Sequence, residues 1–200
     1  FDDAGGNVAK DTSGKGHDGK LMNGPKWVNG KFGMALEFDG KDDYVDCGND
    51  DNLNVNTFTL MAWVFPTSID AATHEMIGGK GWSATERSYY LSLLQGKAFV
   101  SFRNPGNTAQ ADVQGNTAFQ KSTWYHIAGI NNRATNKAAI YVNGVKENEK
   151  AIDYDVMVTP KPLWIGNMED QTLHFNGIID DFAIFNVALT EDEIKSIMTK

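Results

Sequence analysis

The sequence predicts an all-β domain, an antiparallel sandwich of two sheets that ends in one short helix. Three observations support this prediction. The apolar residues recur mainly with a period of two, which is the period of a β-strand. Turns that contain glycine or asparagine separate the apolar runs. One convincing helix signal is present, and it begins near Thr190 at the C-terminal end.

Residues 57–65 (TFTLMAWVF) form the clearest predicted strand, because apolar side chains fall on both of its faces. Asn143-Gly144 gives the strongest hairpin signal, since both residues tolerate positive φ. Gln95-Gly96-Lys97 predicts a second short hairpin, and the stretch Gly78-Gly79-Lys80-Gly81 is expected to be a loop. Further strands are predicted at residues 88–94, 98–102, 124–130, 138–142, 163–166 and 178–185.

The predicted helix starts with a capping box. Thr190 stands at the N-cap and Glu193 three positions later. In this arrangement each side chain can accept a hydrogen bond from the free backbone N–H of the other residue. Leu189 and Ile194 occupy the positions of a hydrophobic staple. We expect this helix to hold the last strand against the sandwich.

Composition predicts one domain over residues 1–200. No linker or repeat divides the chain, and 41% apolar residues are enough for a core. The formal net charge of -8, with scattered basic residues, argues against nucleic acid as a partner. No apolar run is long enough for membrane insertion. The start at Phe1-Asp2, without a signal peptide, is interpreted as a cut from a longer precursor.

Cys47 is the only cysteine, which excludes an internal disulfide framework and a thiolate metal cluster. We expect it to act as a small apolar residue in or beside the core.

Five sequence blocks follow one another over essentially the whole chain. They are residues 11–19 (DTSGKGHDG), residues 32–40 (FGMALEFDG) with 43–45 (DYV), residues 58–66 (FTLMAWVFP), residues 124–128 (WYHIA) with 140–144 (IYVNG), and residues 177–186 (GIIDDFAIFN). In this order they resemble the laminin-G-like, or concanavalin A-like lectin/glucanase, superfamily. The resemblance implies a jellyroll topology and a secreted or cell-surface location.

Asp180 and Asp181 interrupt an otherwise apolar strand, so at least one carboxylate is expected to approach the interior. A buried carboxylate needs a cation, hydrogen bonds or a shifted pKa. The resemblance implies that Asp180 binds a structural calcium ion, with Asp2 or Asp11 and the carbonyl of Gly40 as further ligands. Two alternatives stay open: Asp180 receives only N–H or lysine hydrogen bonds, or the turn acids Asp18, Asp42 and Asp43 supply ligands.

The superfamily also contains glycoside hydrolases, which need two carboxyl groups that face each other across the sugar. The nearest pattern here, Glu37-Phe38-Asp39-Gly40-Lys41-Asp42, ends in aspartate and enters a Gly-Lys turn where a hydrolase strand would continue. The four histidines lack the spacing of a zinc site. We therefore predict that the domain is not an enzyme.

Trp82 lies in a polar, glycine-rich segment without a strand period, and is predicted to be an exposed ligand-binding aromatic. Arg87, Tyr89, Arg103 and Asn104 are close to it in the strand order and are expected to share a concave face. Aromatic rings, amides and arginines are the groups that bind sugars. The expected partner is therefore a glycan. A protein partner in adhesion is the alternative, and a divergent glycosidase is a third; the oligomeric state stays open.

Overall fold

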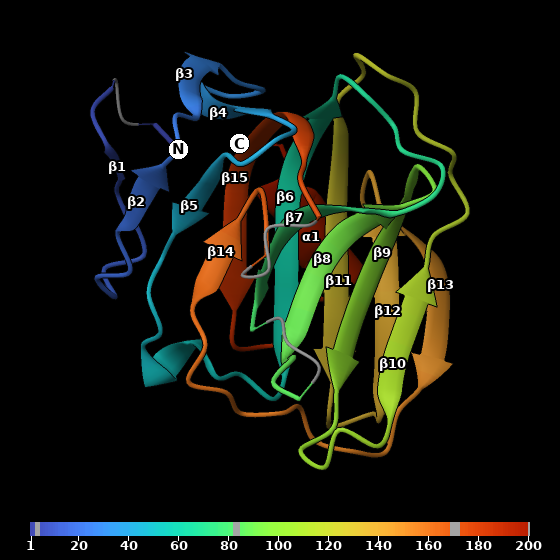
Figure 1. Ribbon diagram of the computed structural model, residues 1–200. Helices are drawn as coiled ribbons and strands as arrows, with labels where there is room; N and C mark the ends of the chain where they lie inside the picture. Colours follow the sequence, from blue (N-terminus) through green and yellow to red (C-terminus); the bar gives the residue numbers. More distant parts are fainter. Residues whose placement is uncertain (3–4, 82–84, 169–172, 200) are drawn as a thin grey trace.

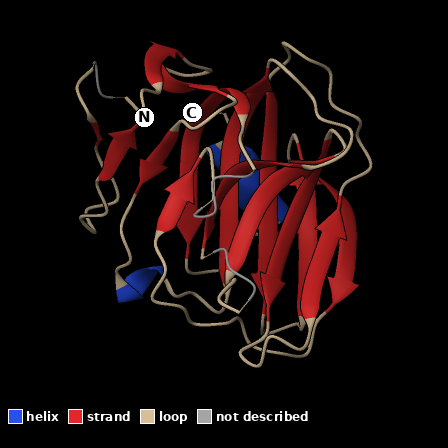
Figure 2. Ribbon diagram, in the orientation of Figure 1, coloured by secondary structure: helices blue, strands red, loops and turns tan. Residues whose placement is uncertain are grey.

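The computed structural model describes residues 1–2, 5–81, 85–168 and 173–199, and its fold is a sandwich of two antiparallel sheets (Figures 1 and 2). The first sheet has eight strands in the order β1 (Val8–Ala9), β2 (Gly19–Met22), β5 (Tyr44–Asp46), β14 (Leu163–Ile165), β7 (His74–Lys80), β8 (Tyr89–Leu94), β9 (Lys97–Arg103) and β10 (Gln110–Gln114). The second has seven, in the order β13 (Val145–Ala151), β12 (Lys137–Val142), β11 (Tyr125–Asn132), β6 (Phe58–Pro66), β15 (Asn176–Phe185), β4 (Met34–Asp39) and β3 (Lys26–Asn29). This architecture confirms the predicted jellyroll sandwich.

The main core lies between the two sheets, where alternate residues of each strand meet. Leu60, Ala62 and Val64 of β6 face Leu91 and Leu93 of β8 across it, and all five are fully buried. Cys47 packs against this core, and burial raises the pKa of its thiol to about 12, as expected of an inert small residue. The strands predicted over residues 57–65, 88–94, 98–102, 124–130, 138–142, 163–166 and 178–185 are all present.

The expected loop at residues 78–81 is wrong for most of its length, because Gly78, Gly79 and Lys80 belong to β7. The two glycines reflect close packing rather than a turn. A Cβ at Gly78 would lie 2.5 Å from the ring of Phe182 in the opposite sheet, and one at Gly79 would lie 2.4 Å from the Cβ of Tyr90. Glycine inside a strand commonly marks such a close approach.

A bulge in β15 follows Asp180 and sets the direction of Phe182. In the register with β6, Asp180 pairs with Trp63 and Ala183 with Met61, so Asp181 and Phe182 oppose the single residue between them. Asp181 adopts a φ of 47°, which accommodates the extra residue. Ile179 and Phe182 thereby face the core, while Asp180 stays on the outer side of the seven-stranded sheet.

The C-terminal helix α1 (Glu191–Ile197) begins with the predicted capping box between Thr190 and Glu193. Its buried Ile194 packs against Met61, Ala128 and Ile130 on the outer face of the seven-stranded sheet. Figure 1 shows α1 behind this sheet. A short 3-10 helix, Asp51–Leu53, follows β5. In the described part of the chain, no helix is long and apolar enough to cross a membrane.

Candidate binding site at one end of the sandwich

Three segments meet at one end of the sandwich: the turn after β4, the loop between β6 and β7, and the start of β15. Asn176 lies at their junction, paired with Asp39 in the sheet. The hydroxyl of Thr67 donates to Asn176 Oδ1 over 2.7 Å. Gly40 has a φ of 75°, and a Cβ there would lie 2.7 Å from the Cβ of Asn176, so glycine is what allows this side chain to pack on the turn.

A first hollow of about 190 Å³ lies on one side of Asn176. Half of its lining residues are acidic, and the lining consists of Lys26, Glu37, Phe38, Asp39, Asp43 and Asn176. Glu37 and Asp39 are two positions apart on β4 and so share a face. Lys26 is the register partner of Glu37 on β3. The hollow therefore combines oxygen acceptors with a single ammonium group.

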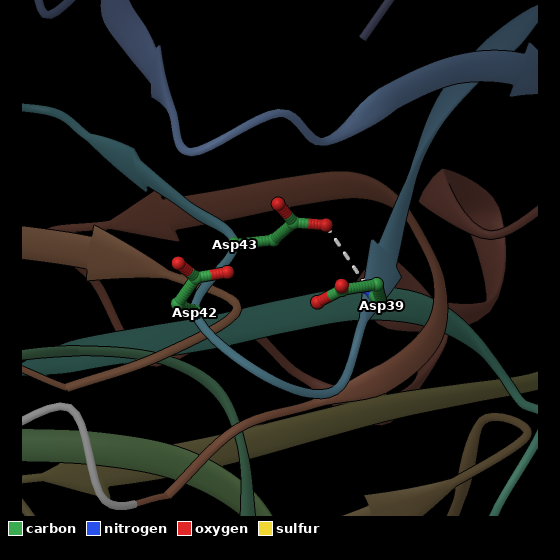
Figure 3. Close-up of side chains that lie close together, drawn as sticks. All are labelled: Asp39, Asp42 and Asp43. Carbon is green, nitrogen blue, oxygen red and sulfur yellow. Dashed lines mark hydrogen bonds between the residues drawn. The ribbon is translucent and has the colours of Figure 1, made fainter.

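Three carboxylates gather beside this hollow (Figure 3). One oxygen from each of Asp39, Asp42 and Asp43 lies within 4.8 Å of the others. Asp43 is buried and accepts the N–H of Asp39 over 3.0 Å, and burial raises its pKa. Burial also raises the pKa of Asp39, but the N–H and the ammonium group of Lys41 outweigh it and lower the pKa overall. The hydrogen bonds of Asp39 and Asp43 within this turn therefore account for the positions of these two carboxylates.

A second hollow of about 170 Å³ lies on the other side of Asn176 and is lined by Gly40, Ser68, Asp70, Thr73, His74, Glu75, His174 and Asn176. Glu75 is only 3% exposed and accepts the N–H of Asp70 over 3.1 Å. Burial raises its pKa to about 7. His174 Nδ1 is enclosed and has no hydrogen-bond partner in the part of the chain that is described. Donors and acceptors thus face the same small space.

Aromatic side chains extend from the second hollow along the outer face of the eight-stranded sheet. His74 contacts Tyr90 and Phe99 edge-on, with ring centroids 5.6 and 5.0 Å away. Its Nδ1 lies 3.0 Å from the hydroxyl of Ser92, and burial lowers its pKa. Met168 packs on this aromatic group from the segment that precedes β15. Tyr90, Phe99 and Met168 are themselves buried, so they support His74 from behind and only His74 of this group lines the hollow.

A family profile described as the concanavalin A-like lectin/glucanases superfamily matches residues 39–195. The chain belongs to this superfamily. The match includes the turn after β4, both loops of the second hollow and the β15 motif. Among curated proteins, none matches the sequence.

Several solved structures share the fold of this concanavalin A-like domain. The binding domain of Paraclostridial Mosquitocidal Protein 1 superposes with a TM-score of 0.77 at 18% identity, over 94% of this chain and 48% of that one. Domain 4 of AbnA, a GH43 extracellular arabinanase from Geobacillus stearothermophilus solved with arabinotriose, gives 0.71 at 20% identity, over 93% and 90%. The botulinum neurotoxin serotype G binding domain gives 0.72 at 15% identity, over 93% and 47%. The chain spans about half the length of the two toxin binding domains.

Four of the sequence-predicted ligand residues of this concanavalin A-like domain are described, and they lie at the opposite end of the eight-stranded sheet from the hollows: Arg87, Tyr89, Arg103 and Asn104. The N–H of Arg103 donates to the carbonyl of Ser88, which brings the residues around Arg87 and Arg103 together. Arg103 also donates to Gln110 and Asn107, and Asn104 accepts two N–H groups of its own turn. Trp82 lies outside the described residues.

Tyr89 is not available to a ligand, which corrects its predicted role. It is fully buried in the core, and its hydroxyl donates to the carbonyl of Leu53 over 2.6 Å. The adjacent Tyr90 faces outward instead, because successive residues of a strand point to opposite faces. The prediction named Tyr89, which lies in the core, whereas Tyr90 beside it lies on the outer face of the sheet.

Of the four predicted calcium ligands, two come together and two lie elsewhere. Asp180 is fully buried under the turn between β3 and β4, where Oδ2 accepts the N–H groups of Lys31 and Phe32 over 2.9 and 3.1 Å. Asp2 reaches the same turn, since its Oδ1 accepts the N–H of Met34 over 3.3 Å. Burial raises the pKa of Asp180, and the N–H of Phe32 lowers it.

Gly40 and Asp11 do not join this pair. Gly40 follows Asp39, the partner of Asn176, and is therefore four residues along β15 from Asp180, or about 13 Å in an extended strand. Asp11 holds its own loop by accepting the N–H groups of Ser13 and His17. These bonds lower the pKa of Asp11 to about 2, even though burial acts to raise it.

The sequence predicts other roles for Glu37, Asp39, Gly40 and Asp43, and nothing local in it connects them with Asn176 or the β6–β7 loop. The residues around Asn176 come from β4, the β6–β7 loop and the segment before β15, far apart in the chain. His74 and His174 were considered only as zinc ligands. A register prediction that paired Asn176 with Asp39 would have been needed to bring these segments together.

Proposed function

We propose that this domain is a non-catalytic extracellular module that binds carbohydrate in the two hollows around Asn176. The observation that carries the proposal is the lining itself: carboxylates, an amide, hydroxyls and imidazoles surround a small space. Sugars present many hydroxyls, and a few well-placed polar groups of these kinds can orient them by hydrogen bonds.

The likeness to known structures supports the proposal without assigning a ligand, since at these identities it shows the fold alone. Domain 4 of the arabinanase, which the chain covers over 90% of its length, was solved with arabinotriose. The toxin binding domains that share the fold agree with a binding role outside the cell. Fold does not decide the ligand, so the hollows have to be tested directly.

A glycan array tests the proposal most broadly. We expect the domain to bind at least one oligosaccharide family, and Asn176→Ala to abolish that binding. Tyr89→Phe is the matched control, because Tyr89 faces the core and its change should leave binding intact. Trp82→Ala tests the sequence-predicted site. If Trp82→Ala abolishes binding and Asn176→Ala does not, the sequence-predicted site binds the glycan instead.

A protein-binding role in adhesion is the alternative. It predicts that no glycan binds above background while the domain still retains a surface or receptor protein.

We propose that the domain is not catalytic, because residues 37–42 do not complete the carboxylate pattern of the hydrolases. β4 ends at Asp39 and the chain turns at Gly40, which has a φ of 75°, whereas a hydrolase strand would continue and carry its second catalytic carboxylate. We expect no release of reducing sugar from any bound glycan. Hydrolysis that Glu37→Gln abolishes would contradict the proposal.

We also propose a structural calcium ion at Asp180 and Asp2, which the resemblance first suggested. Both carboxylates point at the turn between β3 and β4, where the buried Asp180 accepts backbone N–H groups. Calcium suits such a set because it takes carboxylate and carbonyl oxygens in flexible geometry. Gly40 and Asp11 are not part of this proposal.

Thermal melting with calcium and with EDTA tests the ion. A site filled to a hundred times its dissociation constant adds about 2.7 kcal/mol, which corresponds to roughly 5–10 °C for a domain of this size. Asp180→Asn should remove the shift, whereas Asp11→Asn should keep it. An equal melting temperature in both buffers, with no metal found by elemental analysis, would exclude the ion.

A further inference from the structure

The two hollows share one wall, and the first carries an excess of negative charge. Asn176 lines both, so whatever occupies one lies next to whatever occupies the other. The first contains three carboxylates, Glu37, Asp39 and Asp43, against the single ammonium group of Lys26. The second contains two histidines, the carboxylate of Asp70, and Glu75, whose pKa burial raises to about 7.

We infer that the two hollows are neighbouring subsites for one glycan chain that carries no negative charge, with Asn176 in contact with both sugar units. This inference rests on the proposed function and names the class of glycan. Each hollow, at about 190 and 170 Å³, is smaller than a site for a drug-sized ligand, which takes roughly 300–1,000 Å³. Together they reach that range, as expected of two small subsites rather than one large pocket.

The charge of the lining determines which sugars are excluded. Ionised carboxylates accept hydrogen bonds and cannot donate them, so a hydroxyl of the ligand must supply the proton. A uronic acid or sulfate group would instead bring a second anion against Asp39 and Asp43. The anion of the ligand and these carboxylates would repel each other. Because Asp43 is buried, salt screens that repulsion only weakly. An uncharged chain that is rich in hydroxyls can donate hydrogen bonds to these carboxylates and brings no second negative charge.

Asn176 is suited to a position between two sugars. Its Oδ1 accepts from Thr67, which fixes the orientation of the amide. That leaves the Nδ2 group, on the side of Gly40, as a donor among acceptors. The hydroxyls of Ser68 and Thr73 in the second hollow and the ammonium group of Lys26 in the first are further donors. Together they complement the carboxylates, which can only accept.

The test compares chains of different length, and then compares the best-binding oligosaccharide with its own oxidised form. Arabino-, xylo-, gluco-, manno-, galacto- and fructo-oligosaccharides of one to four units are titrated by calorimetry. The best binder with a primary hydroxyl is then oxidised at that hydroxyl to the carboxylate. We expect the disaccharide to bind at least tenfold more tightly than the monosaccharide, and the oxidised chain at least tenfold more weakly than its parent.

Variants assign these differences to the hollows. Asn176→Ala should remove the gain from the second sugar, and Asp39→Asn should reduce the penalty of oxidation. Asp112→Asn is the matched control, since Asp112 is an exposed carboxylate that lines neither hollow. If Asn176→Ala does not fold, His174→Ala provides the same test from the other segment.

The outcomes separate the two claims. An oxidised chain that binds as tightly as its parent, or a monosaccharide that provides the full affinity, overturns this inference and leaves the proposed function intact. Failure of every glycan in the panel to bind overturns the proposed function, and the subsites with it.

Discussion

Glu75 shows how one residue connects stability to the site. Its side chain is almost fully buried, lines the second hollow and fixes the β6–β7 loop by accepting the N–H of Asp70. Burial raises its pKa from 4.5 to about 7, so the folded protein holds this proton over a range in which the unfolded chain has released it.

This difference predicts a pH dependence with a definite sign. Between about pH 4.5 and 7 the folded state binds the extra proton, so its stability falls as the pH rises, by up to about 3 kcal/mol. Glu75→Gln should remove this component. The measurement is chemical denaturation of both proteins from pH 4.5 to 8, and a difference between their stabilities that does not change with pH would contradict the assignment.

Tyr89 gives a second prediction for a single residue. Its hydroxyl makes one buried hydrogen bond, to the carbonyl of Leu53. Tyr89→Phe leaves that carbonyl without this donor and should cost about 1 kcal/mol of unfolding free energy. Urea denaturation measures the loss, and no loss would show that the bond does not contribute.

At the level of the elements, β7 and β15 hold the two sheets at close distance. Gly78 of β7 lies against the ring of Phe182, whose inward direction follows from the bulge at Asp181. Asp180 points outward by the ordinary alternation after Ile179 and lies under the β3–β4 turn. The bulge that follows it turns Phe182 inward and so positions the inter-sheet contact.

A double-mutant cycle tests this contact. Gly78→Ala places a methyl group 2.5 Å from the Phe182 ring and should destabilise the fold by about 1–3 kcal/mol. Phe182→Leu removes the ring, so the two changes together should cost less than their sum. Strict additivity would mean that the ring is not what Gly78 accommodates.

The elements also show what the sequence could predict. Strong period-two runs such as residues 57–65, and the capping box at Thr190, were visible because their signals are local. The two-residue strand β1 and the three-residue β5 are too short for a period to develop. In β7, the glycines that serve close packing looked like a loop. The bulge in β15 depends on a partner strand that the local sequence does not specify.

At the level of the whole molecule, the site depends on topology. The turn after β4, the β6–β7 loop and the segment before β15 meet only because β15 lies between β4 and β6 in the seven-stranded sheet. This adjacency gathers the carboxylates, histidines and amide of the hollows at one end, while Arg103 and Asn104 lie at the other end of the eight-stranded sheet (Figure 1). The glycan-binding site that we propose therefore lies at one end of the sandwich.

Backbone NMR during titration with the best-binding oligosaccharide tests that claim most directly. We predict that the amide signals of Gly40, Glu75, Asn176 and their neighbours shift with a common saturation curve, while those of Arg103 and Asn104 stay in place. Shifts centred on Arg103, with Asn176 unchanged, would contradict the account.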